Sequence, residues 1–327
     1  MPPPPKPGTP KLAGSNASER EKNRKASSLK ITWGTVTPVD SYQIQINVGN
    51  NVTHVNTGAP PKLLANRPDN TKHIIRVRAK KGDLFSPFSD AFSVFTRPKT
   101  PDRPRLVGTA TTADDPLADV KARAANSLKL TWPSVGSGIT YDLDFGGGDV
   151  RNGVSPGETF EDLEPNKLYQ LRVRARDEAR GDVSDFSSPL RKVRTRPPIP
   201  TGLSRLGFDL FFQQIQLNWD SVSTFPGHKQ SKWQLGRRKA GSTSDPQVLA
   251  TGNLSLTHFI ETNYPLGTQQ EYLIRIAAGK NHSFWSPALT VNGPIVNLLG
   301  IQNSFAIIPD VGAAVPSLLD QSDPFRL

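Results

Sequence analysis

The segment SSLKITW at residues 27–33 is repeated as NSLKLTW at 126–132 and, less closely, as QIQLNW at 214–219. A second segment, HIIRVRA at 73–79, recurs as YQLRVRA at 169–175 and as YLIRIAA at 272–278. A serine-bounded segment follows each copy, as SPFS at 86–89, SDFS at 184–187 and SFWS at 283–286. A repeat this long indicates an array of whole domains rather than a solenoid of small units.

The repeated segments alternate apolar and polar residues, which is the pattern of a strand with one buried face. In the first segment Leu29, Ile31 and Trp33 alternate with polar residues, and in the second Ile75 and Val77 alternate with arginines. Only residues 18–25 and 116–125 have the composition of short helical turns. The sequence therefore predicts an all-β chain of two-layer sandwiches.

The repeat places three modules at residues 9–98, 99–197 and 198–295, which we call modules 1, 2 and 3. A Pro-rich arm at 1–8 precedes them and a tail at 296–327 follows them. Pro-marked segments at 96–101 and 195–200 separate the modules. Because such linkers are short and semi-rigid, we expect the modules to line up as a rod.

The early-strand Trp, the Tyr-x-apolar-Arg-Val-Arg-Ala strand and the Ser-x-x-Ser turn resemble fibronectin type III domains over residues 8–295. The resemblance implies seven-stranded, immunoglobulin-like sandwiches with these aromatic residues in their cores: Trp33, Trp132, Trp219, Tyr169 and Tyr272. Module 1 has His73 at the Tyr position. Module 3 is divergent, and its extra length is expected in hairpins at 224–233 and 237–257.

The composition points away from catalysis and cofactors. The chain of 327 residues has no Cys, so it has no disulfide and no thiolate metal site. Its five His residues lack metal-ligand spacing, and no nucleophile or phosphate-binding motif is present. We therefore predict no enzyme activity, no catalytic residue, no metal and no cofactor.

Two tripeptides are candidate receptor-binding loops: Arg180-Gly181-Asp182 and Lys81-Gly82-Asp83. Each follows the Arg-rich segment of its module, which is the loop in which fibronectin's cell-binding module, by resemblance, carries its integrin tripeptide. A plain turn also explains both, because Gly supplies a positive φ and Asp favours turns.

The outward-facing arginines of the second segment are a candidate surface for an acidic glycan or another polyanion. They are Arg76, Arg78, Arg172, Arg174, Arg176 and Arg275. The net charge of +11 is concentrated in residues 9–98, which hold 14 Lys and Arg against 6 Asp and Glu. No aromatic residues are interleaved with these arginines, which argues against specific nucleic-acid binding. The alternative is a solvated face covered by aliphatic stems.

The two ends differ from the modules. The tail is too apolar for a free linker, and its candidate docking residues are Leu298, Leu299, Phe305, Ile307 and Ile308. It could fold back on module 3 or dock on a protein partner by strand addition. The Pro-rich arm is expected to be extended.

The leading hypothesis is a non-enzymatic structural and binding protein, anchored through its tail in a larger assembly such as a virion surface, capsid or tail. The alternatives are an extracellular adhesion or glycan-binding protein and an intracellular scaffold. The sequence shows no signal peptide and no stretch that could span a membrane, so we expect no membrane insertion. A virion or extracellular surface is favoured over the cytoplasm.

Overall fold

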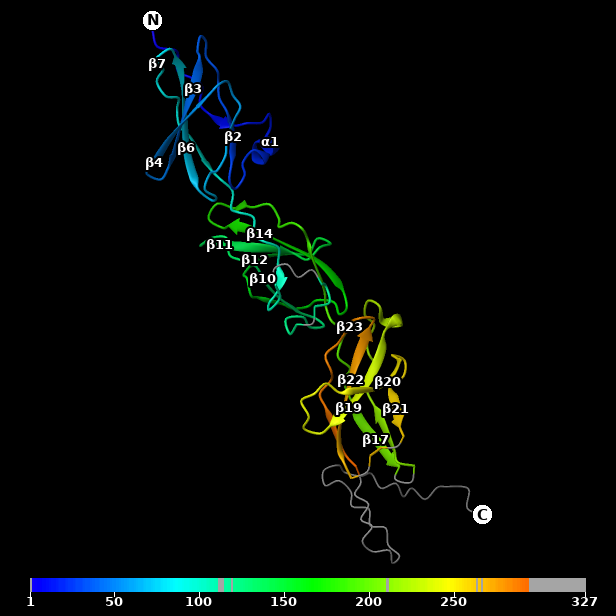
Figure 1. The fold of residues 1–327 in the computed structure, drawn as a ribbon. Helices are drawn as coiled ribbons and strands as arrows, with labels where there is room; N and C mark the ends of the chain where they lie inside the picture. The colour runs from blue at the N-terminus through cyan, green and yellow to red at the C-terminus, as the bar shows by residue number, and fades with distance from the viewer. Residues whose placement is uncertain are drawn as a thin grey trace, which may run out of the picture. The chain divides into compact units, whose positions relative to one another are not determined.

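The computed structural model describes residues 2–110, 115–118, 120–209, 212–262, 264–265 and 267–293 (Figure 1). The chain divides into two compact units. One unit holds residues 1–122, 129–160 and 168–193; the other holds 123–128, 161–167 and the described residues from Arg194 onward. The module boundaries drawn from the repeat remain predictions.

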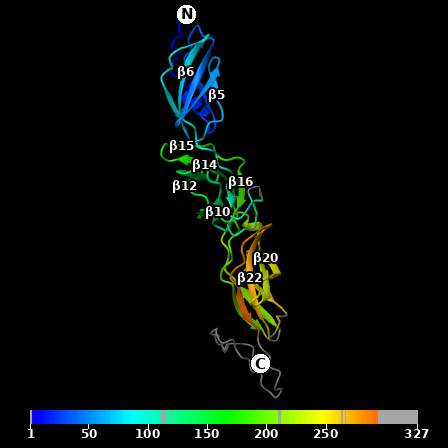
Figure 2. The same ribbon diagram turned by 60° about the vertical axis from the view of Figure 1, so that its left-hand side comes forward.

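Module 1 contains two antiparallel sheets, drawn in blue and cyan in Figures 1 and 2. The first has the order β1 (Lys11–Leu12), β2 (Leu29–Thr32), β5 (Lys62–Leu64). The second has the order β4 (Asn51–Thr57), β3 (Ser41–Val48), β6 (Lys72–Lys81), β7 (Leu84–Phe85), with β8 (Phe92–Phe95) also paired to β6. If β7 and β8 count as one interrupted strand, the module has seven strands.

Modules 2 and 3 repeat this strand order. In module 2 the sheets are β13 (Thr159–Phe160), β10 (Leu128–Thr131), β9 (Arg105–Leu106) and β12 (Val150–Val154), β11 (Ile139–Asp144), β14 (Leu168–Asp177), β15 (Asp182–Val183), with β16 (Arg191–Arg194) on β14. In module 3 they are β17 (Ser204–Asp209), β18 (Gln214–Asn218), β21 (His258–Glu261) and β20 (Gln247–Asn253), β19 (Lys232–Lys239), β22 (Gln269–Ala278), β23 (Asn281–His282), with β24 (Leu289–Asn292) on β22. The predicted all-β class of three tandem sandwiches is confirmed.

The period-2 pattern explains why the two sheets of each module pack together. In module 1 the alternate residues Leu29 and Ile31 of β2 meet Ile44 of β3 and Ile75 and Val77 of β6 in one buried cluster. Every second side chain of a strand points to the same face, so these residues line the core while Lys30 and Arg76 stay exposed.

Two short helical segments lie outside the sheets. The helix α1 (Ala17–Lys22) begins at Asn16, whose side chain accepts a 2.9 Å hydrogen bond from the Glu19 N–H. The 3₁₀ turn η1 (His228–Gln230) lies in module 3. Module 3 also has a longer hairpin, since residues 240–246 connect β19 to β20 whereas two residues connect β3 to β4. The longer hairpin lies within residues 237–257, as predicted. The hairpin predicted at 224–233 is wrong, because that segment contains η1 and leads from β18 to β19, which belong to different sheets.

The prediction of a helical turn at residues 116–125 is wrong for the part of that segment that the structure describes. The Asp115 carboxylate accepts a 2.8 Å hydrogen bond from the Leu117 N–H, and the Asp115 carbonyl accepts one from Ala118. Such a side-chain bond offers the backbone an alternative to a helix. The segment therefore forms turns.

The Pro-rich arm packs on module 1, and its extended conformation remains a prediction. Pro4, Pro7 and Pro10 are buried, which is the period of three of a polyproline helix. The Gly8 N–H donates a 3.1 Å hydrogen bond to the Gly34 carbonyl. The two backbones approach so closely that a Cβ atom on Gly8 would lie 3.1 Å from the Gly34 Cα atom.

Candidate functional site: hairpins and outer sheet faces

The five predicted core aromatics are buried in the sandwiches. The exposed fractions are 5%, 2% and 6% for Trp33, Trp132 and Trp219, and both Tyr169 and Tyr272 are also buried. Each Trp ring packs edge-on against an aromatic ring of the following strand, at centroid distances of 5.5 Å, 5.5 Å and 5.0 Å. Such pairs add to the stability that burial provides.

His73 takes the Tyr position in module 1 and is fully buried. Its Nδ1 atom lies 2.9 Å from the Thr71 carbonyl. Burial lowers the pKa of His73 below its usual value, because an interior site disfavours the charged ring. In module 3 the Tyr272 hydroxyl donates to the Glu261 carboxylate instead.

The Ser-x-x-Ser segment closes the second sheet of each module. In module 2 the Ser187 and Ser184 hydroxyls accept hydrogen bonds of 3.0 Å and 2.9 Å from the Val173 and Ala175 N–H groups. The equivalent serines of modules 1 and 3 make the same bonds. These hydroxyls replace the ladder acceptors that are lost where the last strand is interrupted.

The Arg180-Gly181-Asp182 segment forms the β14–β15 hairpin, and its charged side chains are already paired. The Asp182 carboxylate accepts a 2.7 Å hydrogen bond from Arg24 of module 1 and lies 3.4 Å from Arg180. Arg180 pairs with Asp177 at 2.5 Å and lies over the Phe95 ring at 4.3 Å. The hairpin of module 2 is therefore seated against residues of module 1.

The electrostatics of this hairpin favour the ionised carboxylate. Burial acts to raise the pKa of Asp182, but the hydrogen bond and charge of Arg24, together with those of Arg180, outweigh burial and lower it. A receptor-bound metal would have to displace Arg24 before it could be ligated by Asp182. Both charged side chains of the tripeptide therefore take part in ion pairs within this unit.

The same contact recurs in the other unit with a neutral acceptor. Asn281 of module 3 occupies the position of Asp182, and its side-chain oxygen accepts a 2.6 Å hydrogen bond from Arg123. Arg24 and Arg123 are equivalent, since each forms an isolated bridge to the Leu that opens the Trp strand. Asn281 also donates to Asn166 at 2.6 Å and to the Thr195 carbonyl at 2.8 Å.

Lys81-Gly82-Asp83 lies in the matching hairpin of module 1 but in a different register. Lys81 pairs with Leu84, which leaves Gly82 and Asp83 in the turn itself. The Gly82 N–H donates to Asp40 at 2.7 Å, and Asp83 is exposed. The residue equivalent to Asp182 is Leu84, so the two Gly-Asp pairs do not occupy the same position.

The side chains that bind the outward arginines differ between the modules. In module 2, Arg174 and Arg176 bind the Asp142 carboxylate at 2.8 Å and 2.6 Å, and Arg172 binds Asp144 at 2.7 Å. Burial would raise the pKa of Asp142, but these hydrogen bonds outweigh it and lower the pKa. Three of the six predicted arginines are therefore paired with carboxylates.

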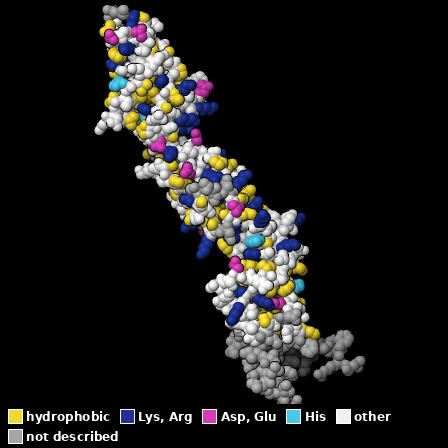
Figure 3. All heavy atoms as spheres, viewed as in Figure 1, with side chains coloured by type: hydrophobic (Ala, Val, Ile, Leu, Met, Phe, Trp, Pro, Cys, Tyr) yellow, Lys and Arg dark blue, Asp and Glu magenta, His cyan; other side chains and the backbone are white. Residues whose placement is uncertain are grey.

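In modules 1 and 3 the equivalent arginines face neutral amides. Arg78 donates to the Gln43 side chain at 2.6 Å, and Arg275 donates to Gln234 at 2.8 Å. Arg76 is exposed. Figure 3 shows Lys and Arg side chains interspersed with hydrophobic and neutral ones on the face that it draws.

Aromatic rings lie under these arginines, although the strand sequences contain none there. They come from the Ser-x-x-Ser segments: Arg78 lies 4.6 Å from Phe88, Arg174 lies 4.7 Å from Phe186, and Arg275 lies 4.3 Å from Trp285. At these distances the guanidinium groups are in cation–π contact with the rings.

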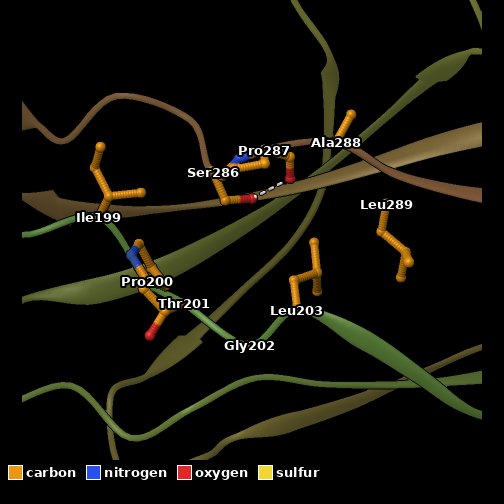
Figure 4. A pocket seen from close by; sticks show the side chains of 9 residues that line it. All are labelled: Ile199, Pro200, Thr201, Gly202, Leu203, Ser286, Pro287, Ala288 and Leu289. Carbon is orange, nitrogen blue, oxygen red and sulfur yellow. Dashed lines mark hydrogen bonds between the residues drawn. The ribbon is translucent and has the colours of Figure 1, made fainter.

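A pocket of about 480 Å³ lies in module 3 between residues 199–203 and 286–289 (Figure 4). Its lining is mainly apolar. The Thr201 hydroxyl is bonded to Asp220 at 2.8 Å, and the Ser286 hydroxyl is bonded to the Pro287 carbonyl at 2.9 Å. The pocket lining holds no side chain that could act as an acid or a base.

The described part of the chain holds no group of three or more metal-ligating side chains. It also contains no helix with the length and apolar character of a membrane span. The candidate docking residues of the tail, Leu298 to Ile308, lie outside the described residues.

The strand order decides the fold. Each module opposes a three-stranded sheet to a sheet of four strands, the last of which is interrupted at Ser-x-x-Ser. The chain is a tandem array of fibronectin type III folds. The sequence itself matches no family model and no curated protein.

Solved structures that resemble the chain are also fibronectin type III arrays. The FN1-FN3 domains of chicken CNTN1 share 14% identity over 89% of this chain and 99% of that one, with a TM-score of 0.26. The central fibronectin-III array of RIM-binding protein shares 17% identity over 89% and 97%, with a TM-score of 0.24. A two-domain segment of chicken tenascin shares 15% identity over 57% and 99%, with a TM-score of 0.34.

Sequence reasoning missed the residues against which the fibronectin type III hairpins are seated. Arg24 and Arg123 stand five residues before Leu29 and Leu128, and the Thr-Arg-Pro sequence of residues 96–98 recurs at 195–197. Aligning the loops of the copies, in addition to their strands, would have found these pairs.

Proposed function

We propose that this fibronectin type III array is a non-enzymatic structural and binding protein that is anchored in a larger assembly. The recurrence of one contact carries the proposal: Arg24 holds Asp182, and Arg123 holds Asn281. In each case a hairpin of one module binds an arginine of the preceding module. Such contacts between neighbouring modules suit a structural protein.

The anchoring step rests on the sequence of the tail. Residues 296–327 carry the apolar residues Leu298, Leu299 and Phe305 without belonging to a module. An apolar segment of this kind gains free energy when it docks on a partner. The assembly that we favour is a virion, with the chain at its surface, in its capsid or in the virion's own tail.

Deletion of residues 296–327 tests this proposal. We expect the full chain, expressed in its native source, to co-sediment with particles, and the deleted chain to remain in the supernatant. A Phe305→Leu variant, which keeps the apolar character of the tail, is the control and should still co-sediment. A full chain that is monomeric in every fraction would contradict the proposal.

Adhesion through Arg180-Gly181-Asp182 is the weaker alternative, because Arg24 and Arg180 already bind the carboxylate. Attachment of cells to the immobilised chain that is lost in Asp182→Ala, but kept in Asp83→Ala, would favour adhesion over our proposal.

A further inference from the structure

The charged side chains on the strands of the second sheet of module 1 are all positive. Its strands β3, β4, β6, β7 and β8 contain Lys72, Arg76, Arg78, Lys80 and Lys81, and no Asp or Glu. Even residues of β6 point outward, since His73, Ile75, Val77 and Ala79 are buried. We call Arg76, Arg78, Lys80 and the adjacent Gln43 and Gln45 the cationic face.

Comparison with module 2 shows that the neighbouring strand of this sheet supplies no carboxylate opposite the arginines. Gln43 pairs in register with Arg78 and Gln45 with Arg76, whereas Asp142 and Asp144 stand opposite the equivalent arginines of module 2. Asp90, which lies outside the strands, is exposed and is bound to Lys6 at 2.9 Å. The hydrogen bond and the charge of Lys6 lower the pKa of Asp90 most, and the charge of Arg76 also lowers it. The cationic face therefore attracts anions more strongly than its counterpart in module 2.

The cationic face is also held in place before any ligand arrives. Arg78 lies over the Phe85 ring at 3.9 Å and donates to Gln43 at 3.0 Å and 2.6 Å. Gln43 in turn donates to Asn56 of β4 at 3.1 Å. A guanidinium fixed in this way loses less side-chain entropy when it binds an anion.

The chemistry of the surrounding side chains identifies the class of partner. Arginine edges bind planar or tetrahedral anions through paired hydrogen bonds. Gln45, His54 and Asn56 are neighbours that can bond to hydroxyl groups. Single-stranded nucleic acid needs open aromatic faces for base stacking, and Arg78 lies over both Phe85 and Phe88.

We propose that the cationic face of module 1 binds an acidic glycan, through sulfate or carboxylate groups at Arg76, Arg78 and Lys80 and through sugar hydroxyls at the amides. The proposal deepens the binding half of the proposed function, and it does not depend on the tail. It commits to a glycan and leaves nucleic acid and acidic protein as outcomes of the test.

The test measures binding of heparin, a sulfated glycan, to the full chain at physiological salt. The Arg76→Gln/Lys80→Gln variant leaves the Arg78–Gln43 bonds intact and should weaken binding by about tenfold. The control is Lys11→Gln/Lys30→Gln, which removes the same charge from exposed positions on the opposite sheet of module 1 and should change binding by less than about twofold. Arg78→Lys keeps the charge, and it should still weaken binding because lysine lacks the pair of Nη1 and Nη2 donors, which lies on the other edge from the Nε and Nη2 bonds to Gln43.

Equal losses in the two double variants would overturn the proposal, since they would show a net-charge effect. Tighter binding of an oligonucleotide or of polyglutamate than of heparin would also overturn it. Heparin binding by the chain that lacks residues 296–327 separates this inference from the anchoring proposal. The glycan site should survive that deletion whether or not particle association does.

Discussion

Trp132 anchors the core of module 2, because its ring is 2% exposed and packs edge-on against Tyr141. Replacing a buried Trp with Ala leaves a cavity that the strands around it cannot fill. We expect Trp132→Ala to lower the free energy of unfolding of module 2 by about 3–5 kcal/mol in urea titrations. Val150→Ala, at an exposed position of the same module, should cost under about 0.5 kcal/mol. Similar effects of the two changes would contradict the assigned register.

His73 makes the stability of module 1 depend on pH. Its pKa is lowered by burial, so the unfolded chain takes up a proton first as the pH falls below about 6.5. The unfolding free energy should therefore fall between pH 6.5 and 5, and His73→Tyr should remove that slope. The exposed His54 serves as the control, since His54→Gln should keep the slope. An unchanged slope in His73→Tyr would count against the buried neutral ring.

At the scale of the strand, the Ser-x-x-Ser segment supplies acceptors that the backbone lacks. Ser187→Ala leaves the Val173 N–H without its 3.0 Å partner inside the sheet. We expect a loss of about 1–3 kcal/mol in the free energy of unfolding. Ser137→Ala, in an exposed turn, is the matched control and should be neutral within error. A neutral Ser187→Ala would mean that water replaces the hydroxyl.

The β14–β15 hairpin makes a testable contact with module 1. Asp182→Ala should speed amide hydrogen exchange in residues 20–24 and 177–183, because Arg24 loses its partner. Asp83→Ala should change neither segment. In the parent chain the lowered pKa of Asp182 means that the contact is complete above about pH 4 and is lost as the pH falls further. Unchanged hydrogen exchange in Asp182→Ala would contradict the contact between the β14–β15 hairpin and Arg24.

The strands and cores could be predicted from the sequence because alternation is a local property. The alternation of Leu29, Ile31 and Trp33 with polar residues indicates, within one segment, which face of the strand is buried. The partners of Asp182 and Arg78 could not be predicted in this way. Arg24 lies 158 residues from Asp182, and Phe88 reaches Arg78 from a turn outside the alternating strand. The positions of the arginines in the sequence do not show which residues lie opposite them on the neighbouring strand. In module 2 that residue is Asp142, which neutralises the arginines, and in module 1 it is Gln43, which does not.

At the scale of the whole molecule, each module buries its own cluster of apolar residues. The clusters around Ile44 in module 1 and around Ile274 in module 3 share no member. Because the cores are separate, unfolding of one module should leave the backbone amides in the strands of the others protected from hydrogen exchange. The repeat in the sequence also indicates separate cores, because each copy carries its own Trp.

Hydrogen exchange of the full chain, with Trp33, Trp132 and Trp219 replaced by Ala one at a time, tests this claim most directly. We predict that each change removes amide protection from the strands of its own module and leaves the strands of the other two protected. Loss of protection in all three modules after any one change would show a single shared core and contradict the account.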